Sequence, residues 1–336
     1  MNLHWIFLAT VLLAGGARCQ NAATLPVVRA ADAPPPGRIE GTDFIRYHKG
    51  EKVGRLETAA VTYENLDTGQ TVTLLAVVHI GDKSYFADLQ KRLADFDVVL
   101  YEGVKKGEKD VSDELTWITR MQVALKDYLG LEYQKDRIDY TAKNLLHADM
   151  SMDEVDALLE ERGVGLLPYS EALSNMGPIV EMGLKLMKKL GGDSDSPQFR
   201  VVRQKMKTTM ATVLGNGLSV YDKFKRQDDK LRDEVIIEAR NAVVATKLAE
   251  TLKGKTSKKI AVLYGAAHMP DLEKRLLDDL QLRKSKVEWV PAWTIQMDGS
   301  EAVEEPQDPA EGNTSGSDSR PTSAPASRPV ERRRKI

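Results

Sequence analysis

Two stretches of the sequence, Leu74–Asp82 (LLAVVHIGD) and Ala261–Asp271 (AVLYGAAHMPD), lead from apolar residues into a histidine near Gly, Pro or Asp. Short apolar runs that end at turn-forming residues are typical of strands buried on both faces of a sheet. In an open α/β sheet, the carboxyl end of such a strand faces the crevice where ligands bind. The pattern therefore predicts an α/β fold with His79 and His268 as site residues.

Each of these strands opens a strand, helix, strand unit. The first is entered through a hairpin from RLETAAVTYEN and continues through SYFADLQKRLADF to DVVLYEG, which carries Glu102. The second continues through PDLEKRLLDDL to KVEWVPAWTI, and its helix repeats the DLQKRL at Asp88 as DLEKRL at Asp271. We therefore expect a mixed central sheet made from two duplicated βαβ units and flanked by helices, with chance similarity of amphipathic helices as the alternative for the hexapeptides.

The remaining segments divide the chain further. A long, mainly helical insert is expected at about 112–254, including a capping box at Ser151 and Glu154. Residues 1–17 have the apolar core and small residues of a cleaved secretory leader, which predicts a secreted or periplasmic protein, or one anchored to the membrane if the leader is retained. Residues 18–40 are a Pro-rich linker and residues 298–336 a tail predicted to be disordered, so the folded domain is expected at 41–297.

Composition narrows the partners of this domain. The formal net charge of -2 and a pI near 6.3 give no basic surface of the kind that binds phosphates, so nucleic acid is not an expected partner. The single cysteine, Cys19, precedes the folded domain, so any metal there would need histidine, carboxylate and water ligands. The oligomeric state is left open.

Three strand ends supply His79, Glu102 and His268, and the carboxyl ends of parallel strands lie along one edge of a sheet. Two imidazoles and a carboxylate are a common ligand set for a divalent metal with open positions for water and substrate. Such a metal activates water and polarises a carbonyl, as amide or ester hydrolysis requires. Without a metal, Glu102 could orient one imidazole as a general base.

Four more residues are candidates for this site. In RDEVIIEARNAVVATKLAETL, Arg240 shares the apolar helix face of Ile236 and Val244, where its guanidinium would pair with Glu102 or a substrate carboxylate, unless its head reaches solvent. The adjacent Asn241 could add a neutral hydrogen bond. His147 and Asp149, expected in a loop ahead of a helix, would be further ligands, substrate contacts or proton carriers, with helix capping as the alternative for the aspartate.

With these residues, the chain resembles the TraB/PrgY/Tiki family, also called the TraB/GumN group, and more distantly the ChaN and erythromycin esterase-like proteins. That family has two Gly-x-x-His motifs, a glutamate after the first and an Arg-Asn pair before the second. The chain matches them with Glu102, Arg240–Asn241 and the motif Gly265–His268, while Ala76 stands in place of the first motif's glycine.

The resemblance implies a mixed sheet flanked by helices and, in the Tiki branch, a peptidase that depends on manganese or cobalt; zinc would suit the same ligands. We therefore expect an exported metal-dependent hydrolase of peptide or protein substrates, in which His79, Glu102 and His268 hold the metal and Arg240 anchors the glutamate or the substrate. Other relatives imply two alternatives, a protein that sequesters a peptide or haem without turnover, and a metal-free esterase.

Overall fold

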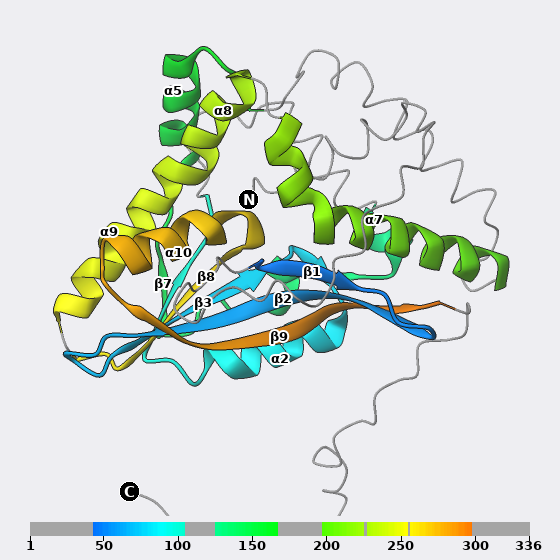
Figure 1. The fold of residues 1–336 in the computed structure, drawn as a ribbon, viewed down its shortest axis with the longest axis horizontal. Coiled ribbons are helices and arrows are strands. Elements are labelled where there is room, and N and C mark those ends of the chain that lie inside the picture. Colours follow the sequence, from blue (N-terminus) through cyan, green and yellow to red (C-terminus); the bar gives the residue numbers. More distant parts are fainter. Residues whose placement is uncertain (1–42, 105–124, 167–196, 225–226, 255, 298–336) are drawn as a thin grey trace, which may run out of the picture. The chain divides into compact units, whose positions relative to one another are not determined.

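The computed structural model describes residues 43–104, 125–166, 197–224, 227–254 and 256–297 (Figure 1). The expected leader, linker and tail lie outside these residues, as do three parts of the expected insert, so those assignments stay predictions. Among the described helices, none is long and apolar enough to cross a bilayer.

A seven-stranded mixed sheet forms the centre of the fold, in the order β1-β2-β3-β8-β5-β7, with β9 also paired to β2. The parallel part is β3, β8, β5 and β7, while β1, β3 and β9 all run antiparallel to β2. The predicted α/β fold with a mixed sheet is therefore confirmed. The strands are β1 (Ile45–His48), β2 (Val53–Glu64), β3 (Thr71–Val77), β5 (Val98–Tyr101), β7 (Leu145–His147), β8 (Lys259–Gly265) and β9 (Arg283–Gln296).

Helices cover both faces of this sheet, with α2 (Lys83–Leu93) on one and α10 (Met269–Asp278) on the other (Figure 1). Side chains five residues apart in a strand point to opposite faces. Thr58 in β2 contacts the hydroxyl of Tyr85 in α2 at 3.1 Å, whereas Tyr63 in β2 donates a 2.6 Å hydrogen bond to Glu273 in α10. Both faces of the central strands are therefore buried, which is why their sequences are apolar at nearly every position.

The two predicted strand, helix, strand units are present, but they are placed differently in the sheet. In the first, α2 connects β3 to β5, and β8 lies between these strands. In the second, α10 connects β8 to β9, which lies beyond β3 and β2. The connection through α2 and the connection through α10 therefore cross the sheet in opposite directions. Connections between parallel strands are right-handed, so two connections that run in opposite directions place their helices on opposite faces of the sheet. An origin of the two units by duplication stays a prediction.

The region expected to be a helical insert also contributes strands. Within it, β7 pairs in parallel with β5, so His147 ends a strand of the main sheet and does not lie in the expected loop. A two-residue strand, β6 (Glu132–Tyr133), pairs with β4 (Ile80–Gly81) directly after His79 and leads into the short helix α4 (Gln134–Arg137). The predicted capping box at Ser151 is confirmed at the start of α5 (Met152–Arg162).

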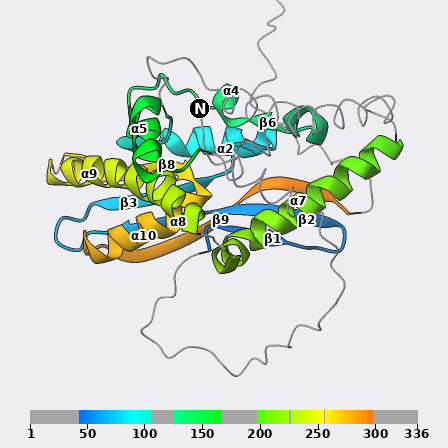
Figure 2. The same ribbon diagram turned by 90° about the horizontal axis from the view of Figure 1, so that it is seen from above.

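Three further described helices lie later in this region, and a π-helical turn joins the last two immediately before Arg240. The first, α7 (Pro197–Phe224), packs against β1 and β9, as Figure 2 shows from above. The next, α8 (Gln227–Asp233), continues through a π-helical turn, η1 (Glu234–Ala239), into α9 (Arg240–Lys253). Single π-turns inside α-helices are frequent at functional sites, because the extra residue per turn re-aims the side chains that follow it.

Candidate functional site

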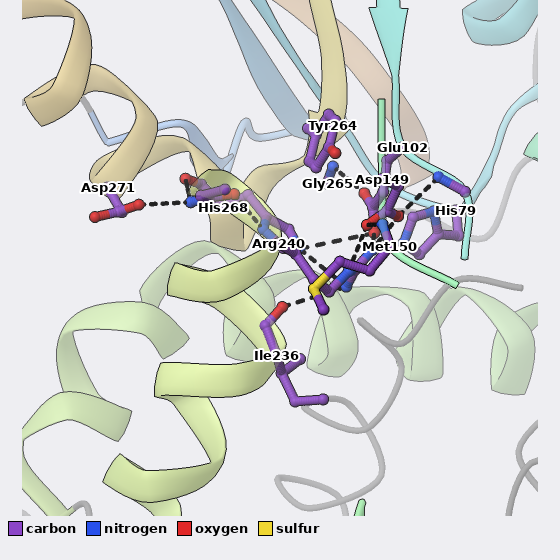
Figure 3. A network of polar contacts seen from close by, with 12 residues as sticks. His79, Glu102, Asp149, Met150, Ile236, Arg240, Tyr264, Gly265, His268 and Asp271 are labelled. Atoms are coloured by element: carbon purple, nitrogen blue, oxygen red, sulfur yellow. Dashed lines mark hydrogen bonds and ion pairs between the residues drawn. The ribbon is translucent and has the colours of Figure 1, made fainter. Parts of the chain in front are cut away.

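The carboxyl ends of four parallel strands bring the candidate residues to one edge of the sheet (Figure 3). His79 follows β3 by two residues, and Glu102 follows β5 directly. His268 ends a short 3-10 turn, η2 (Ala266–His268), after β8, while Asp149 follows β7 by two residues. The placement expected for the first three residues is therefore observed, and β7 adds a fourth strand end that the sequence pattern did not reveal.

Arg240 is the centre of this network. Its Nε and Nη2 donate to the two carboxylate oxygens of Asp149 at 2.9 and 2.7 Å, a bidentate pair. Nη2 also donates to Glu102 Oε1 at 2.7 Å, and Nη1 donates to the carbonyl of Ile236 at 3.3 Å. The guanidinium expected on the inner face of its helix thus faces inward and pairs with Glu102, and Asp149 is its second anionic partner, not a helix cap.

Two carboxylates share one guanidinium in this cluster. One guanidinium faces the carboxylates of Glu102 and Asp149, and all three side chains are almost fully buried. Burial alone would lower the pKa of Arg240, but the charges of Asp149 and Glu102 outweigh burial and raise that pKa well above its usual range. Counted over the described side chains that contact one another here, one guanidinium and two ionised carboxylates carry one excess negative charge. A buried excess charge is costly, so the cluster favours a further positive charge beside it.

The second oxygen of Glu102 is also engaged. Oε2 accepts a 2.7 Å hydrogen bond from the backbone N–H of Gly265, at the end of the neighbouring strand β8. Oε1, which receives Arg240, lies 3.7 Å from Nε2 of His268. The carboxylate is therefore fixed between two strand ends and held beside an imidazole.

His268 is oriented by Asn241, the residue after Arg240. The side-chain Nδ2 of Asn241 donates to the carbonyl of His268 at 3.0 Å and to Asp271 Oδ2 at 2.9 Å. With both amide hydrogens used, Asn241 Oδ1 must accept the 2.7 Å hydrogen bond that joins it to His268 Nδ1. Neutral His268 therefore carries its proton on Nδ1, and its Nε2 faces Arg240 Nη1 at 3.3 Å.

His79 is held by a residue of the short helix α4. Its Nδ1 lies 2.9 Å from Gln134 Oε1, and its carbonyl accepts a 2.8 Å hydrogen bond from the backbone N–H of Gln134. In Figure 3 its ring points toward Glu102 and Asp149. His79 and Glu102 each keep 4% exposure, whereas Arg240, Asn241 and His268 are fully buried. All five residues are therefore buried, and the Nε2 atom of His79 is itself buried.

Two further contacts tie the strand ends together. His147 shares a hydrogen bond between its Nε2 and the carbonyl of Gly103, directly after Glu102, and its ring packs edge-on against Tyr101. The backbone N–H of Gly103 donates to Asp149 Oδ2 at 2.9 Å. His147 thus lies beside the network, in contact with the segment that carries Glu102.

The arrangement of these donors bears on the expected metal. An ion bridging Glu102 Oε1 and His268 Nε2 would lie against Arg240, whose nitrogens approach those two atoms at 2.7 and 3.3 Å. The guanidinium would repel the ion, and it already uses the carboxylate oxygen. Within the described ranges, no group of three or more His, Cys, Asp or Glu side chains has an arrangement that could hold a metal ion. The trio of His79, Glu102 and His268 therefore does not fit a divalent metal while Arg240 holds this position, and metal binding stays a prediction.

Sequence reasoning missed three polar contributors to the site. Asp271 lies one turn after His268, at the start of α10, a spacing that could have indicated a shared contact. Tyr264 donates to the carbonyl of Ala148, and its ring packs edge-on against His268. Gln134 gave no signal in the sequence, because only tertiary pairing of β4 with β6 brings it to His79.

Comparisons of the chain with protein-family models, with curated proteins and with solved structures find no match. The resemblance to the TraB/PrgY/Tiki family therefore stays a prediction.

Proposed function

We propose that the chain is a hydrolase of ester or amide bonds that works by general acid–base catalysis at the strand ends. One observation carries this proposal. The ring of His79 points toward Glu102 (Figure 3), which lies in a buried cluster with Asp149 and Arg240. The carboxylates of this cluster favour an imidazole that takes up a proton, as a general base must do during the reaction.

His79 is the residue that we assign as the base, because the Nε2 of His268 faces the guanidinium of Arg240 at 3.3 Å, whereas the ring of His79 points toward Glu102 (Figure 3). In the first step, Nε2 of His79 removes a proton from water, and the oxygen of that water attacks the substrate carbonyl carbon. In the second step, the imidazolium returns the proton to the leaving oxygen or nitrogen as the single bond between that atom and the former carbonyl carbon breaks and the carbonyl re-forms. Water is thus added across the bond, and His79 ends in its starting state.

The other residues support this chemistry without exchanging the proton. Glu102 is held by Arg240 and Gly265, so its charge stays in place to stabilise the imidazolium. His268 and Asn241 hold each other through two hydrogen bonds, and His268 contacts Arg240 on the other side of the cluster. The five N–H groups of Arg240 are taken up by the two carboxylates, the carbonyl of Ile236 and Nε2 of His268. We therefore assign Arg240 to holding Glu102 and not to binding a substrate carboxylate.

The test is hydrolysis of two substrate sets, nitrophenyl esters of graded acyl length and a mixed peptide library, each with and without EDTA. We expect turnover that persists in EDTA and falls about 100-fold or more in His79→Asn, the usual size of a general-base contribution. His48→Asn, an exposed histidine of β1, is the matched control and should keep full activity.

Three results would contradict the proposal. Turnover that EDTA abolishes and manganese, cobalt or zinc restores would favour the metal-dependent peptidase expected from the resemblance. A folded protein with no turnover that acquires a visible absorption band with haem would favour sequestration. Equal activity of His79→Asn and the wild type would place the chemistry elsewhere. Export through the leader predicted at 1–17 is a separate proposal, tested by N-terminal sequencing of the mature protein.

A further inference from the structure

We infer that Gln134 is a positioning residue that fixes His79 in the Nδ1–H tautomer and so leaves the lone pair on Nε2, the atom to which we assign the proton transfer. The inference deepens the proposed function and rests on it for its meaning, but the tautomer itself can be measured without any substrate. The contacts of Gln134 with His79 and Tyr140, and a parallel with His268, carry the argument.

Gln134 holds His79 at two points. Its backbone N–H donates to the His79 carbonyl at 2.8 Å, and its side-chain Oε1 lies 2.9 Å from His79 Nδ1. Both residues are at least 96% buried, so neither contact is open to exchange with bulk water. The pairing of Ile80 with Tyr133 keeps the two segments in register.

The amide of Gln134 is itself oriented by a third residue. Its Nε2 donates a 2.9 Å hydrogen bond to the hydroxyl of Tyr140. Burial raises the pKa of Tyr140 above its usual value, so this hydroxyl stays protonated and cannot switch to a charged partner at neutral pH. With Nε2 directed to Tyr140, Oε1 faces the imidazole and accepts from Nδ1–H, and the lone pair of His79 is left on Nε2.

His268 shows the same construction at the other side of the site. Asn241 contacts both the carbonyl and the Nδ1 of His268, as Gln134 does for His79. Two histidines from distant strands are thus each held at the same two atoms by one amide residue. An outer partner that fixes the ring and its tautomer is how proteins prepare imidazoles for proton transfer or ligation.

Nitrogen-15 NMR of the full chain, labelled at histidine, tests the inference directly because the two tautomers give different ring-nitrogen shifts. The His79 signals are assigned by their loss in His79→Asn. We expect Nδ1–H for His79 and for His268 in the wild type. Gln134→Met should release His79 into a tautomer mixture and lower kcat/KM about 10- to 100-fold. Gln134→Glu, which keeps an acceptor at Nδ1, should restore the Nδ1–H pattern.

Two more variants complete the design. Tyr140→Phe should allow the Gln134 amide to turn and give mixed tautomers while the fold is kept. Gln90→Met is the control, since Gln90 accepts from the backbone of Asp139 and makes no contact with His79. A His79 that carries its proton on Nε2 in the wild type, or an unchanged spectrum in folded Gln134→Met, would overturn the inference. If the spectra show the expected tautomers but no substrate is hydrolysed, the inference about Gln134 is supported and only the proposed function is contradicted.

Discussion

Asn241 and His268 are joined by two hydrogen bonds, one from the amide to the histidine carbonyl at 3.0 Å and one from Nδ1–H to the amide oxygen at 2.7 Å. The second amide hydrogen reaches Asp271 at 2.9 Å. Asn241 therefore joins α9 to the start of α10 through three contacts. The two contacts with His268 are buried, so bulk water cannot replace them, whereas the contact with Asp271 is partly exposed.

Replacing this amide tests its role in both stability and activity. Asn241→Leu removes the acceptor of the His268 Nδ1–H and one donor to the His268 carbonyl, so we expect it to lower the free energy of unfolding by about 1–3 kcal/mol and to reduce kcat/KM. Urea unfolding and turnover measure the two effects. Asn65→Ala is the control, because it removes two turn contacts of the β2–β3 hairpin. That variant should lose stability and keep its activity; equal losses of activity in both would contradict the role of Asn241.

Burial decides the strength of two ion pairs that have the same length. Arg240 to Asp149 and Arg275 to Asp271 are both 2.7 Å, but the first pair is fully buried and the second is about one quarter exposed. Arg240→Met should cost about 3–5 kcal/mol, because two buried carboxylates lose their partner. Arg275→Met should cost about 1 kcal/mol or less. Similar unfolding free energies for the two variants would contradict this prediction. They would show that Glu102 and Asp149 can stay buried without Arg240 at little cost.

The charge of Glu102 can be removed without changing its shape. Glu102→Gln leaves Arg240 paired with Asp149 alone, so the excess negative charge of the cluster disappears. We expect stability within about 2 kcal/mol of the wild type, the cost of one poorly matched buried hydrogen bond. Turnover should fall about 100-fold, because the imidazolium loses its stabilising charge. A variant that keeps full turnover would remove Glu102 from the chemistry.

Acid should lower the stability of helix α5, which begins shortly after Asp149. In the capping box of α5, the carboxylate of Glu154 accepts hydrogen bonds from Ser151. The bond from the backbone N–H has the larger effect and the bond from the hydroxyl the smaller one, and both hold the pKa of Glu154 below its ordinary 4.5. Because the folded-state pKa is the lower one, this stabilisation is present above pH 4.5 and is lost as the pH falls through the folded value. Glu154→Gln should be less stable than the wild type at pH 7 by a few tenths of a kcal/mol, and the difference should vanish at low pH.

The measurement is urea unfolding of the wild type and Glu154→Gln from pH 3 to pH 7. Glu160→Gln, on the same helix outside the capping box, controls for the loss of one surface charge. A difference between the wild type and Glu154→Gln that stays constant across this range would exclude the carboxylate as its cause.

Much of the architecture follows from local pattern. The apolar runs of β3, β5 and β8 end at His79, Glu102 and His268, and the parallel geometry of such strands is enough to predict that their ends share an edge. The helical spacing of Ile236, Arg240 and Val244 was likewise enough to predict an inward guanidinium.

Other features depend on contacts between distant segments. The sequence of β9 does not encode which edge it joins, since its pairing with β2 depends on the length and direction of the connection through α10. The short strand β7 and the contact of Gln134 with His79 are set by tertiary pairing, and neither has a periodic pattern of its own. The bidentate pair of Asp149 with Arg240 joins residues 91 positions apart, beyond the reach of any local motif.

The π-turn at Glu234–Ala239 implies that this helix is sensitive to a change in length. Each residue of an α-helix advances the side-chain direction by about 100°, so deleting one residue from this turn would rotate everything after it by that angle. Arg240 and Asn241 would swing together out of the interior, and Glu102, Asp149 and His268 would lose their contacts with this helix in one step. An insertion or deletion here would therefore inactivate the site as a unit, whereas point substitutions dismantle it one contact at a time.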